Sequence, residues 1–284
     1  MTSRALAVTF LALCGLGASA CGAAASTSAA GATDAVPQTA EMRSVAPPAA
    51  STSARAATAG TPSPAKPLAG KVIVIDPGHN GGNYRHPEVI NKKVNVLTEW
   101  KPCDTTGTST NDGYSEAAFT WDVANRMVKL LRAKGATVKL TRGSDTSVGP
   151  CITQRAAIGN RAHANAAVSI HADGAPASGR GFHIIMPKKI NGPVDPVVGP
   201  SRKLGLALRD AYKSGTGMPY STYLGKDALD YRSDLGGLNL STVPKVFIET
   251  GNMRNPTDAA KLKDPSFRQR IAVSLTEGLQ KYLG

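Results

Sequence analysis

Short apolar runs alternate with amphipathic helical patterns from about residue 71 to the C-terminus. The apolar runs are about five residues long and rich in Val and Ile, which is typical of buried strands. They predict strands over residues 71–75, 137–141, 166–170, 182–186 and 245–249. Apolar positions three and four residues apart predict helices over residues 116–134, 151–162, 200–213 and 267–282. This alternation predicts an α/β fold, a single domain with a mainly parallel twisted sheet flanked by helices.

The first residues show a different pattern. Arg4 precedes an uncharged apolar stretch, residues 5–20, that ends in Ala18-Ser19-Ala20. A charged residue, a short apolar segment and small residues at its end predict a signal peptide over residues 1–20. Cys21 follows directly, as in a bacterial lipobox, although Ala18 stands where such boxes usually have Leu. The sequence therefore leaves two interpretations open, a lipid anchor at Cys21 with membrane association, or ordinary secretion.

Residues 22–69 carry no hydrophobic period. Ala, Ser, Thr, Pro and Gly make up 38 of these 48 residues. Such a segment buries too little apolar surface to offset the entropy of ordering it. We therefore expect a flexible tether over residues 21–69 and one folded domain over residues 70–284.

Composition and charge narrow the class of protein. A hydrophobic content of 41% excludes a wholly disordered chain, and 33 Lys and Arg against 20 Asp and Glu give a net charge of +13. The excess favours polyanionic surroundings such as nucleic acid, anionic lipid or an acidic cell wall. No nucleic-acid reader motif accompanies the charge, and the export signal also argues against a nucleic-acid partner.

Four cysteines are present, and Cys14 leaves with the signal peptide. In an oxidising compartment the pair that remains in the folded domain, Cys103 and Cys151, should be bridged. Cys21 is then the odd one out, either lipidated or a free thiol.

Candidate chemistry gathers at the ends of the predicted strands. His79, His171 and Glu249 each follow or end an apolar run, and Glu116 opens the first long helix. The carboxyl ends of parallel strands meet at one edge of a sheet, so we expect these side chains to converge. Two imidazoles and one carboxylate form a ligand set for catalytic zinc, and a further carboxylate can take a proton from water. Each residue alone also has a structural explanation, such as Glu116 complementing a helix dipole.

Several motifs in this order resemble a known family. They are IVIDPGH (73–79), SE (115–116), LTR (140–142) with Asp145, QRA (154–156), VSIHAD (168–173), VPKVFIETGN (243–252) and NPTD (255–258). From Val72 to Tyr282 the domain resembles the zinc-dependent N-acetylmuramoyl-L-alanine amidases of the type-3 class, which cleave peptidoglycan.

The resemblance implies a function and a site. It implies that His79, Glu116 and His171 bind Zn²⁺ and that Glu249 is the catalytic carboxylate. The expected reaction is hydrolysis of the amide between N-acetylmuramic acid and L-alanine of the stem peptide. The expected partner is peptidoglycan. We expect the protein to be a monomer and to be secreted, periplasmic or bound to the cell wall.

Two departures from the family pattern keep alternatives open. The segment between His79 and Glu116 is longer than the family usually needs, and its Glu88 is a rival third ligand. Asp173 stands where the family commonly has Asn, which could alter hydrogen bonding around the ligands. The alternative functions are a zinc peptidase acting within the stem peptide and a non-catalytic cell-wall-binding protein.

Overall fold

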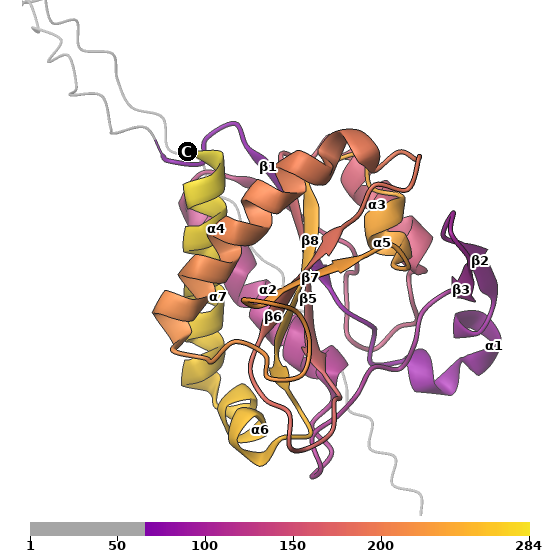
Figure 1. Cartoon of the computed structure of the whole chain (residues 1–284), viewed down its shortest axis with the longest axis vertical. Helices are drawn as coiled ribbons and strands as arrows, with labels where there is room; N and C mark the ends of the chain where they lie inside the picture. Colours follow the sequence, from indigo (N-terminus) through magenta and orange to yellow (C-terminus); the bar gives the residue numbers. More distant parts are fainter. Residues whose placement is uncertain (1–65) are drawn as a thin grey trace, which may run out of the picture. The chain divides into compact units, whose positions relative to one another are not determined.

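The computed structural model of the chain describes residues 66–284, so the predicted signal peptide, Cys21 and the tether up to residue 65 lie outside the described residues. A six-stranded sheet with strand order β4-β1-β5-β8-β6-β7 forms the centre of the described part (Figure 1). The strands are β1 (Val72–Pro77), β4 (Thr137–Leu140), β5 (Ala166–Asp173), β6 (His183–Pro187), β7 (Leu229–Arg232) and β8 (Lys245–Asn252).

Helices cover both faces of this sheet. On one face lie α2 (Glu116–Ala133), α4 (Val198–Thr216) and α7 (Pro265–Leu283), and on the other α3 (Ile152–Arg161) and the short α5 (Gly236–Asn239) (Figure 1). Strands β4, β1, β5 and β8 are parallel, β6 is antiparallel to β8, and β7 is parallel to β6. The predicted α/β domain with a mainly parallel sheet is confirmed. No helix within residues 66–284 has the length and apolar character needed to cross a membrane.

Several short elements differ from those that the hydrophobic pattern predicts. Strand β7 has no fully buried residue, and the hairpin of β2 (Lys93–Asn95) and β3 (Trp100–Pro102) is largely exposed, so neither produces an apolar run. Helix α6 (Pro256–Lys263) starts at the N-cap Asn255. The other short helices are α1 (Pro87–Ile90), η1 (Asn83–Arg85) and η2 (Asp195–Val197).

The alternation of residues along each strand separates a core face from a polar face. In β8, Val246 and Ile248 belong to the main core with residues of α2, α4 and α7. Successive side chains of a strand point to opposite faces, so Glu249 points away from this core. His171 of β5 pairs in register with Glu249. It follows the core residue Ile170, so its side chain also points away from the main core. The polar strand ends therefore share the face that α3 and α5 only partly cover.

The folded domain includes residues before residue 70. Leu68 is fully buried in the main core, and its backbone N–H donates to the carbonyl of Lys134 over 2.9 Å. A single Leu among Pro and Ala residues gives no periodic signal, so the hydrophobic pattern leaves it in the tether. The packing instead places Leu68 within the domain, two residues before the predicted start.

Candidate active site

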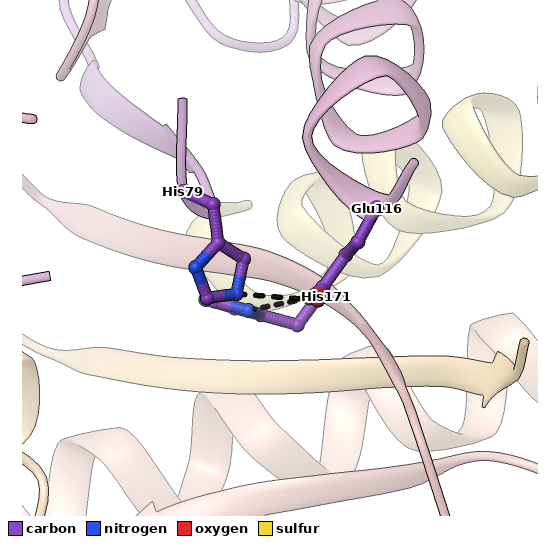
Figure 2. Close-up of side chains that lie close together, drawn as sticks. All are labelled: His79, Glu116 and His171. Atoms are coloured by element: carbon purple, nitrogen blue, oxygen red, sulfur yellow. Dashed lines mark hydrogen bonds and ion pairs between the residues drawn. The ribbon is translucent and has the colours of Figure 1, made fainter. Parts of the chain in front are cut away.

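Three side chains from separate elements meet at the carboxyl end of the sheet. His79 follows β1, Glu116 is the first residue of α2, and His171 lies in β5 (Figure 2). One potential ligand atom of each lies within 4.8 Å of those of the others, close enough for one ion to contact all three. Two imidazole nitrogens and a carboxylate oxygen are a donor set that catalytic zinc sites use. The residues therefore fit a metal ion by position and by chemistry.

Glu116 stands between the two imidazoles. Its Oε1 lies 2.9 Å from Nδ1 of His171 and its Oε2 lies 3.2 Å from Nε2 of His79. The backbone N–H groups of Thr108 and Ala172 also donate to this carboxylate, over 2.9 and 3.1 Å. Burial raises the pKa of Glu116, but the two histidines outweigh it and lower the pKa far below the usual value. Glu116 is thus an ionised carboxylate that accepts from two backbone N–H groups and faces one imidazole nitrogen of each histidine.

The backbone of His79 is in the left-handed region, with φ of 58°. Few residues other than glycine adopt this conformation, and where they do it is often at a functional site. Burial lowers the pKa of the His79 imidazole, but the carboxylates of Glu116 and Asp104 outweigh it and raise the pKa to about 10. A strained turn and two carboxylates therefore determine where this ring lies.

The ring of His171 is packed on both sides. It stacks on Phe247 of β8, with ring centroids 5.2 Å apart and planes 15° from parallel. A Cβ atom at Gly78 would overlap the His171 ring, so only glycine fits there. At Gly107, with φ of +74°, a Cβ atom would lie 2.7 Å from His79 Cδ2 and 2.8 Å from Glu116 Oε2. Two glycines therefore leave the space that the ligand side chains occupy.

Glu249 lines the same cavity as the three candidate ligands. This cavity, of about 210 Å³, is also lined by Asp173, Arg232 and Phe247. Atom Oε2 of Glu249 is buried and has no hydrogen-bond partner among the described residues. Burial, with the negative charges of Glu116 and Asp173, raises its pKa well above the usual value. An unpaired buried carboxylate beside a candidate metal site is suited to accept a proton.

A second cavity, of about 200 Å³, adjoins this one. The two share His79, His171, Leu235 and Phe247, and the second extends to Pro102 and Ile152. Much of its wall is apolar, and its charged lining residues are Asp76, Lys101, Asp104, Arg155 and Asp234. The candidate ligands therefore lie between a carboxylate-lined cavity and a more apolar one.

Comparison with known proteins identifies the domain. The sequence profile of the N-acetylmuramoyl-L-alanine amidase family matches residues 73–281. The chain belongs to the N-acetylmuramoyl-L-alanine amidase family. It is 42% identical over 218 residues, 76% of this chain and 88% of the relative, to the N-acetylmuramoyl-L-alanine amidase Rv3717 of Mycobacterium tuberculosis.

Solved structures of such amidases have the same fold. The amidase Ami1 of Mycobacterium smegmatis is similar with a TM-score of 0.72 and 40% identity, covering 76% of this chain and 98% of that one. The apo form of Ami1 from Mycobacterium abscessus has a TM-score of 0.72 and 41% identity, covering 76% of this chain and 100% of that one.

Other candidates from the sequence take different places in this amidase-family domain. Glu88, the rival third ligand, is exposed, pairs with His86 over 3.1 Å and lies outside the group of His79, Glu116 and His171. Asp173 lines the cavity beside Glu249, and its Oδ1 accepts from the N–H of Gly174. Cys103 and Cys151 form the predicted disulfide.

Several residues at the amidase-family site carry no signal in the sequence that distinguishes them. Asp104 and Thr105 contact His79 from an irregular segment, and Phe247 stacks on His171 although its strand reads as an ordinary apolar run. His183 pairs in register with Glu249 from the neighbouring strand. The apolar spacing predicts the strands but not which strands are neighbours, so these contacts emerge only in the folded domain.

Proposed function

We propose that this protein is a zinc-dependent peptidoglycan hydrolase. It cleaves the amide bond between the lactyl group of N-acetylmuramic acid and L-alanine of the stem peptide. The observation that carries the proposal is the convergence of His79, Glu116 and His171 beside the unpaired carboxylate of Glu249, in a domain of the amidase family.

The three convergent side chains would hold the metal. His79 and His171 would each offer an imidazole nitrogen, which binds a metal only in its neutral form, and Glu116 would offer a carboxylate oxygen. Zinc is the metal that this donor set suits best, since it accepts both nitrogen and oxygen ligands and leaves a position for water. A bound zinc ion supplies a Lewis acid that polarises the scissile carbonyl and lowers the pKa of water.

Glu249 moves the proton. Its buried Oε2 makes no other hydrogen bond among the described residues, so it is free to accept a proton from the attacking water. The same carboxyl then delivers that proton to the nitrogen of L-alanine as the amide breaks. Glu116 has a different role, because it would bind the metal and each of its oxygens already accepts from a backbone N–H group.

The adjoining apolar cavity is suited to small alkyl groups beside the scissile bond. The lactyl group and L-alanine each carry a methyl group, and the walls formed by Pro102, Ile152, Leu235 and Phe247 offer apolar contact close to His79 and His171. The charged residues that line it are already paired with one another, Arg155 with Asp104 and Asp76, and Lys101 with Asp234. We therefore assign this cavity to the groups that flank the amide.

We also propose that the protein acts outside the cytoplasm, where its substrate lies. The predicted signal peptide over residues 1–20 and the predicted tether that precedes the domain support this placement, and the net charge of +13 suits an acidic wall. Cys21 would anchor the chain if it is lipidated. Replacing Cys21 by Ser would then release the protein from membranes, whereas ordinary secretion predicts no change in its distribution.

The decisive experiment is digestion of purified peptidoglycan with and without a chelator, with products identified by mass. The proposal predicts intact stem peptides beginning with L-alanine, and glycan strands with free N-acetylmuramic acid. Chelation should abolish both, and added zinc should restore them. Fragments cut within the stem peptide would instead indicate a peptidase, and zinc content without turnover would indicate a wall-binding protein.

A further inference from the structure

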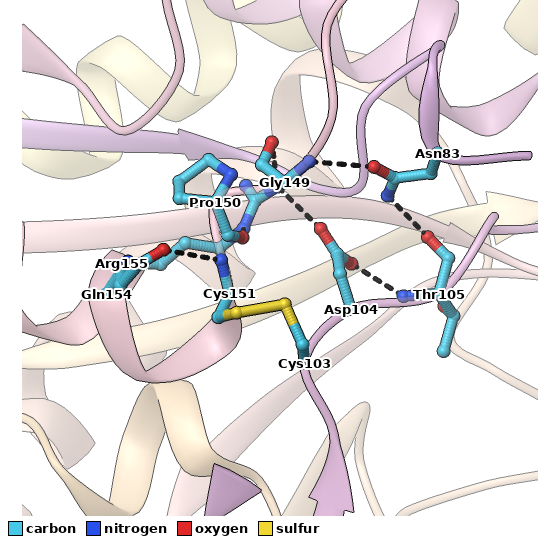
Figure 3. The surroundings of a disulfide bond; sticks show 9 residues. All are labelled: Asn83, Cys103, Asp104, Thr105, Gly149, Pro150, Cys151, Gln154 and Arg155. Carbon is cyan, nitrogen blue, oxygen red and sulfur yellow. Dashed lines mark hydrogen bonds and ion pairs between the residues drawn. A yellow bond between two sulfur atoms is a disulfide. The ribbon is translucent and has the colours of Figure 1, made fainter. Parts of the chain in front are cut away.

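A covalently anchored segment contacts one of the candidate ligands. Cys103 is bridged to Cys151, and the next two residues, Asp104 and Thr105, lie against His79. This segment belongs to the stretch between His79 and Glu116 and has no regular secondary structure over residues 104–108. Figure 3 shows the disulfide with Asp104 and Thr105 directly beyond it. Because it has no regular secondary structure, the position of this segment depends on the disulfide and on its hydrogen bonds.

Within residues 66–284, the polar contacts of His79 Nδ1 all come from this segment. The carbonyl and the hydroxyl oxygen of Thr105 each lie 3.1 Å away, and Oδ1 of Asp104 lies 3.4 Å away. On the other side of the ring, Nε2 faces Glu116. A carbonyl and a carboxylate at Nδ1 favour the tautomer with its proton on Nδ1, which leaves the lone pair of Nε2 available to a metal.

Asp104 is itself tightly held. It is buried, its Oδ2 accepts from Arg155 over 3.0 Å, and its Oδ1 accepts from the N–H of Thr105 over 2.8 Å. Arg155 also donates to the carbonyl of His79 over 2.8 Å. One guanidinium therefore ties the backbone of His79 to the carboxylate that contacts its ring.

The disulfide fixes this segment to helix α3, which supplies Arg155. Cys151 is the N-cap of α3, and the N–H of Ile152 donates to the carbonyl of Cys103 over 2.7 Å. The segment contacts the hairpin side too, because the N–H of Cys103 donates to the carbonyl of Lys92 over 2.7 Å. The covalent bond thus lies one residue from Asp104 and four residues from Arg155.

We propose that Asp104 and Thr105 are positioning residues for His79, and that the Cys103–Cys151 disulfide maintains them. Metal affinity then depends on the oxidised disulfide. The proposal rests on the metal-binding part of the proposed function and not on the choice of substrate. It assigns a role to the long segment between His79 and Glu116 that neither the ligand set nor the general base accounts for.

The first test measures zinc affinity by competition with a chromophoric chelator. Asp104→Asn, which keeps the shape and the acceptor for Arg155, should weaken zinc binding about tenfold, and Asp104→Ala up to about a hundredfold. The matched control is Glu99→Gln, an exposed acid that also lies between His79 and Glu116 but precedes β3, and its loss should leave affinity unchanged. Melting temperatures identify any loss that comes from unfolding. Wild-type affinity in a folded Asp104→Asn variant would overturn the proposal.

The second test removes the disulfide. The Cys103→Ser, Cys151→Ser double variant should fold, as seen by circular dichroism, and bind zinc at least tenfold more weakly. Adding Asp104→Asn to this variant should weaken zinc binding little further, because both changes act through the same segment. Fully additive losses would contradict a shared mechanism. If His79→Ala leaves zinc affinity unchanged, the proposed metal site itself is wrong. If His79→Ala weakens zinc binding but Asp104→Asn and the double cysteine variant do not, the metal site stands and the positioning role is wrong.

Discussion

Two glutamates reach the same cavity from different elements, and their surroundings predict different roles. Glu116 is held by two imidazoles and two backbone N–H groups, whereas Oε2 of Glu249 has no partner. Glu249→Gln should therefore keep the fold and the metal but lose about 10² to 10⁴ in turnover, the range typical of a lost general base. Glu116→Gln should lose metal affinity together with activity.

Zinc content, melting temperature and turnover measured on both variants separate these roles. If Glu249 only stabilised the end of β8, Glu249→Gln would lower the melting temperature and leave turnover per folded molecule near the wild-type value. Equal zinc loss in both variants would place Glu249 among the ligands.

The glycines behind the ligands give a second prediction at the residue scale. A side chain at Gly107 would collide with His79 and Glu116 and would also have to adopt a φ of +74°. Gly107→Ala should therefore reduce zinc affinity and activity together. Gly143 is the matched control, since no atom lies within 4 Å of a Cβ built there. Activity and zinc binding measured on both variants test this, and a Gly107→Ala variant indistinguishable from Gly143→Ala would contradict it.

At the scale of elements, the disulfide joins the irregular segment after β3 to the start of α3. Its two cysteines are 48 residues apart. Closing a loop of this length stabilises a protein by roughly 4 kcal/mol in the chain-entropy description, before any native-state strain is subtracted. We expect the Cys103→Ser, Cys151→Ser variant to unfold at a clearly lower urea concentration, and a midpoint unchanged from wild type would be inconsistent with this. Thiol counting on the denatured, unreduced protein should find neither cysteine free.

The junction between tether and domain gives another prediction at this scale. Leu68 is fully buried although it lies four residues before the start of the first strand. Leu68→Ala should cost about 2 to 5 kcal/mol, the usual range for a buried leucine. Ala69→Ser is the control, because Ala69 is exposed and its change should have little effect. Urea unfolding of the two variants compares them directly, and equal stabilities would show that Leu68 does not contribute to the core.

At the scale of the whole domain, a buried ionic cluster links strands that are distant in the sequence. Asp76 of β1 contacts Arg155 of α3 over 2.9 Å and Lys245 of β8 over 3.0 Å. Burial raises the pKa of Asp76, but the two cations outweigh it and hold the pKa well below the usual value. The cluster adjoins the site, since Arg155 also contacts Asp104 and both Asp76 and Arg155 line the second cavity.

This cluster predicts how stability depends on pH. Because the pKa of Asp76 is lower in the folded state, its stabilisation is complete above the unfolded pKa of about 4 and is lost as the pH falls toward the folded value. Asp76→Asn leaves two buried cations short of a partner, so it should cost about 3 to 5 kcal/mol at pH 7. Urea unfolding at pH 7 and pH 3.5 should show a smaller difference from wild type at the lower pH. Asp227→Asn is the control, because Asp227 is exposed and forms no ion pair within the described residues, so it should show little difference at either pH.

The sequence by itself determined the main strands and helices, because apolar spacing reports local burial directly. It also indicated His79, His171 and Glu249, since each stands at the end of an apolar run where a parallel sheet gathers its chemistry. The pairing of Cys103 with Cys151 followed from counting alone. Sequence reasoning thus identified only those residues whose role is indicated by the residues next to them in the chain.

The tertiary structure decided which side chains meet. Glu88 and Glu116 are both acids that follow His79 in the sequence and were both candidates for the third ligand. Only Glu116, the first residue of α2, lies beside the two histidines in the structure. Asp104 lies 51 residues from its partner Arg155, and no local pattern marks it as a contact of His79. Strand order, and not composition, brings Phe247 against His171. Contacts between distant residues depend on how the elements pack, and the periodicity of a single element contains no information about its neighbours.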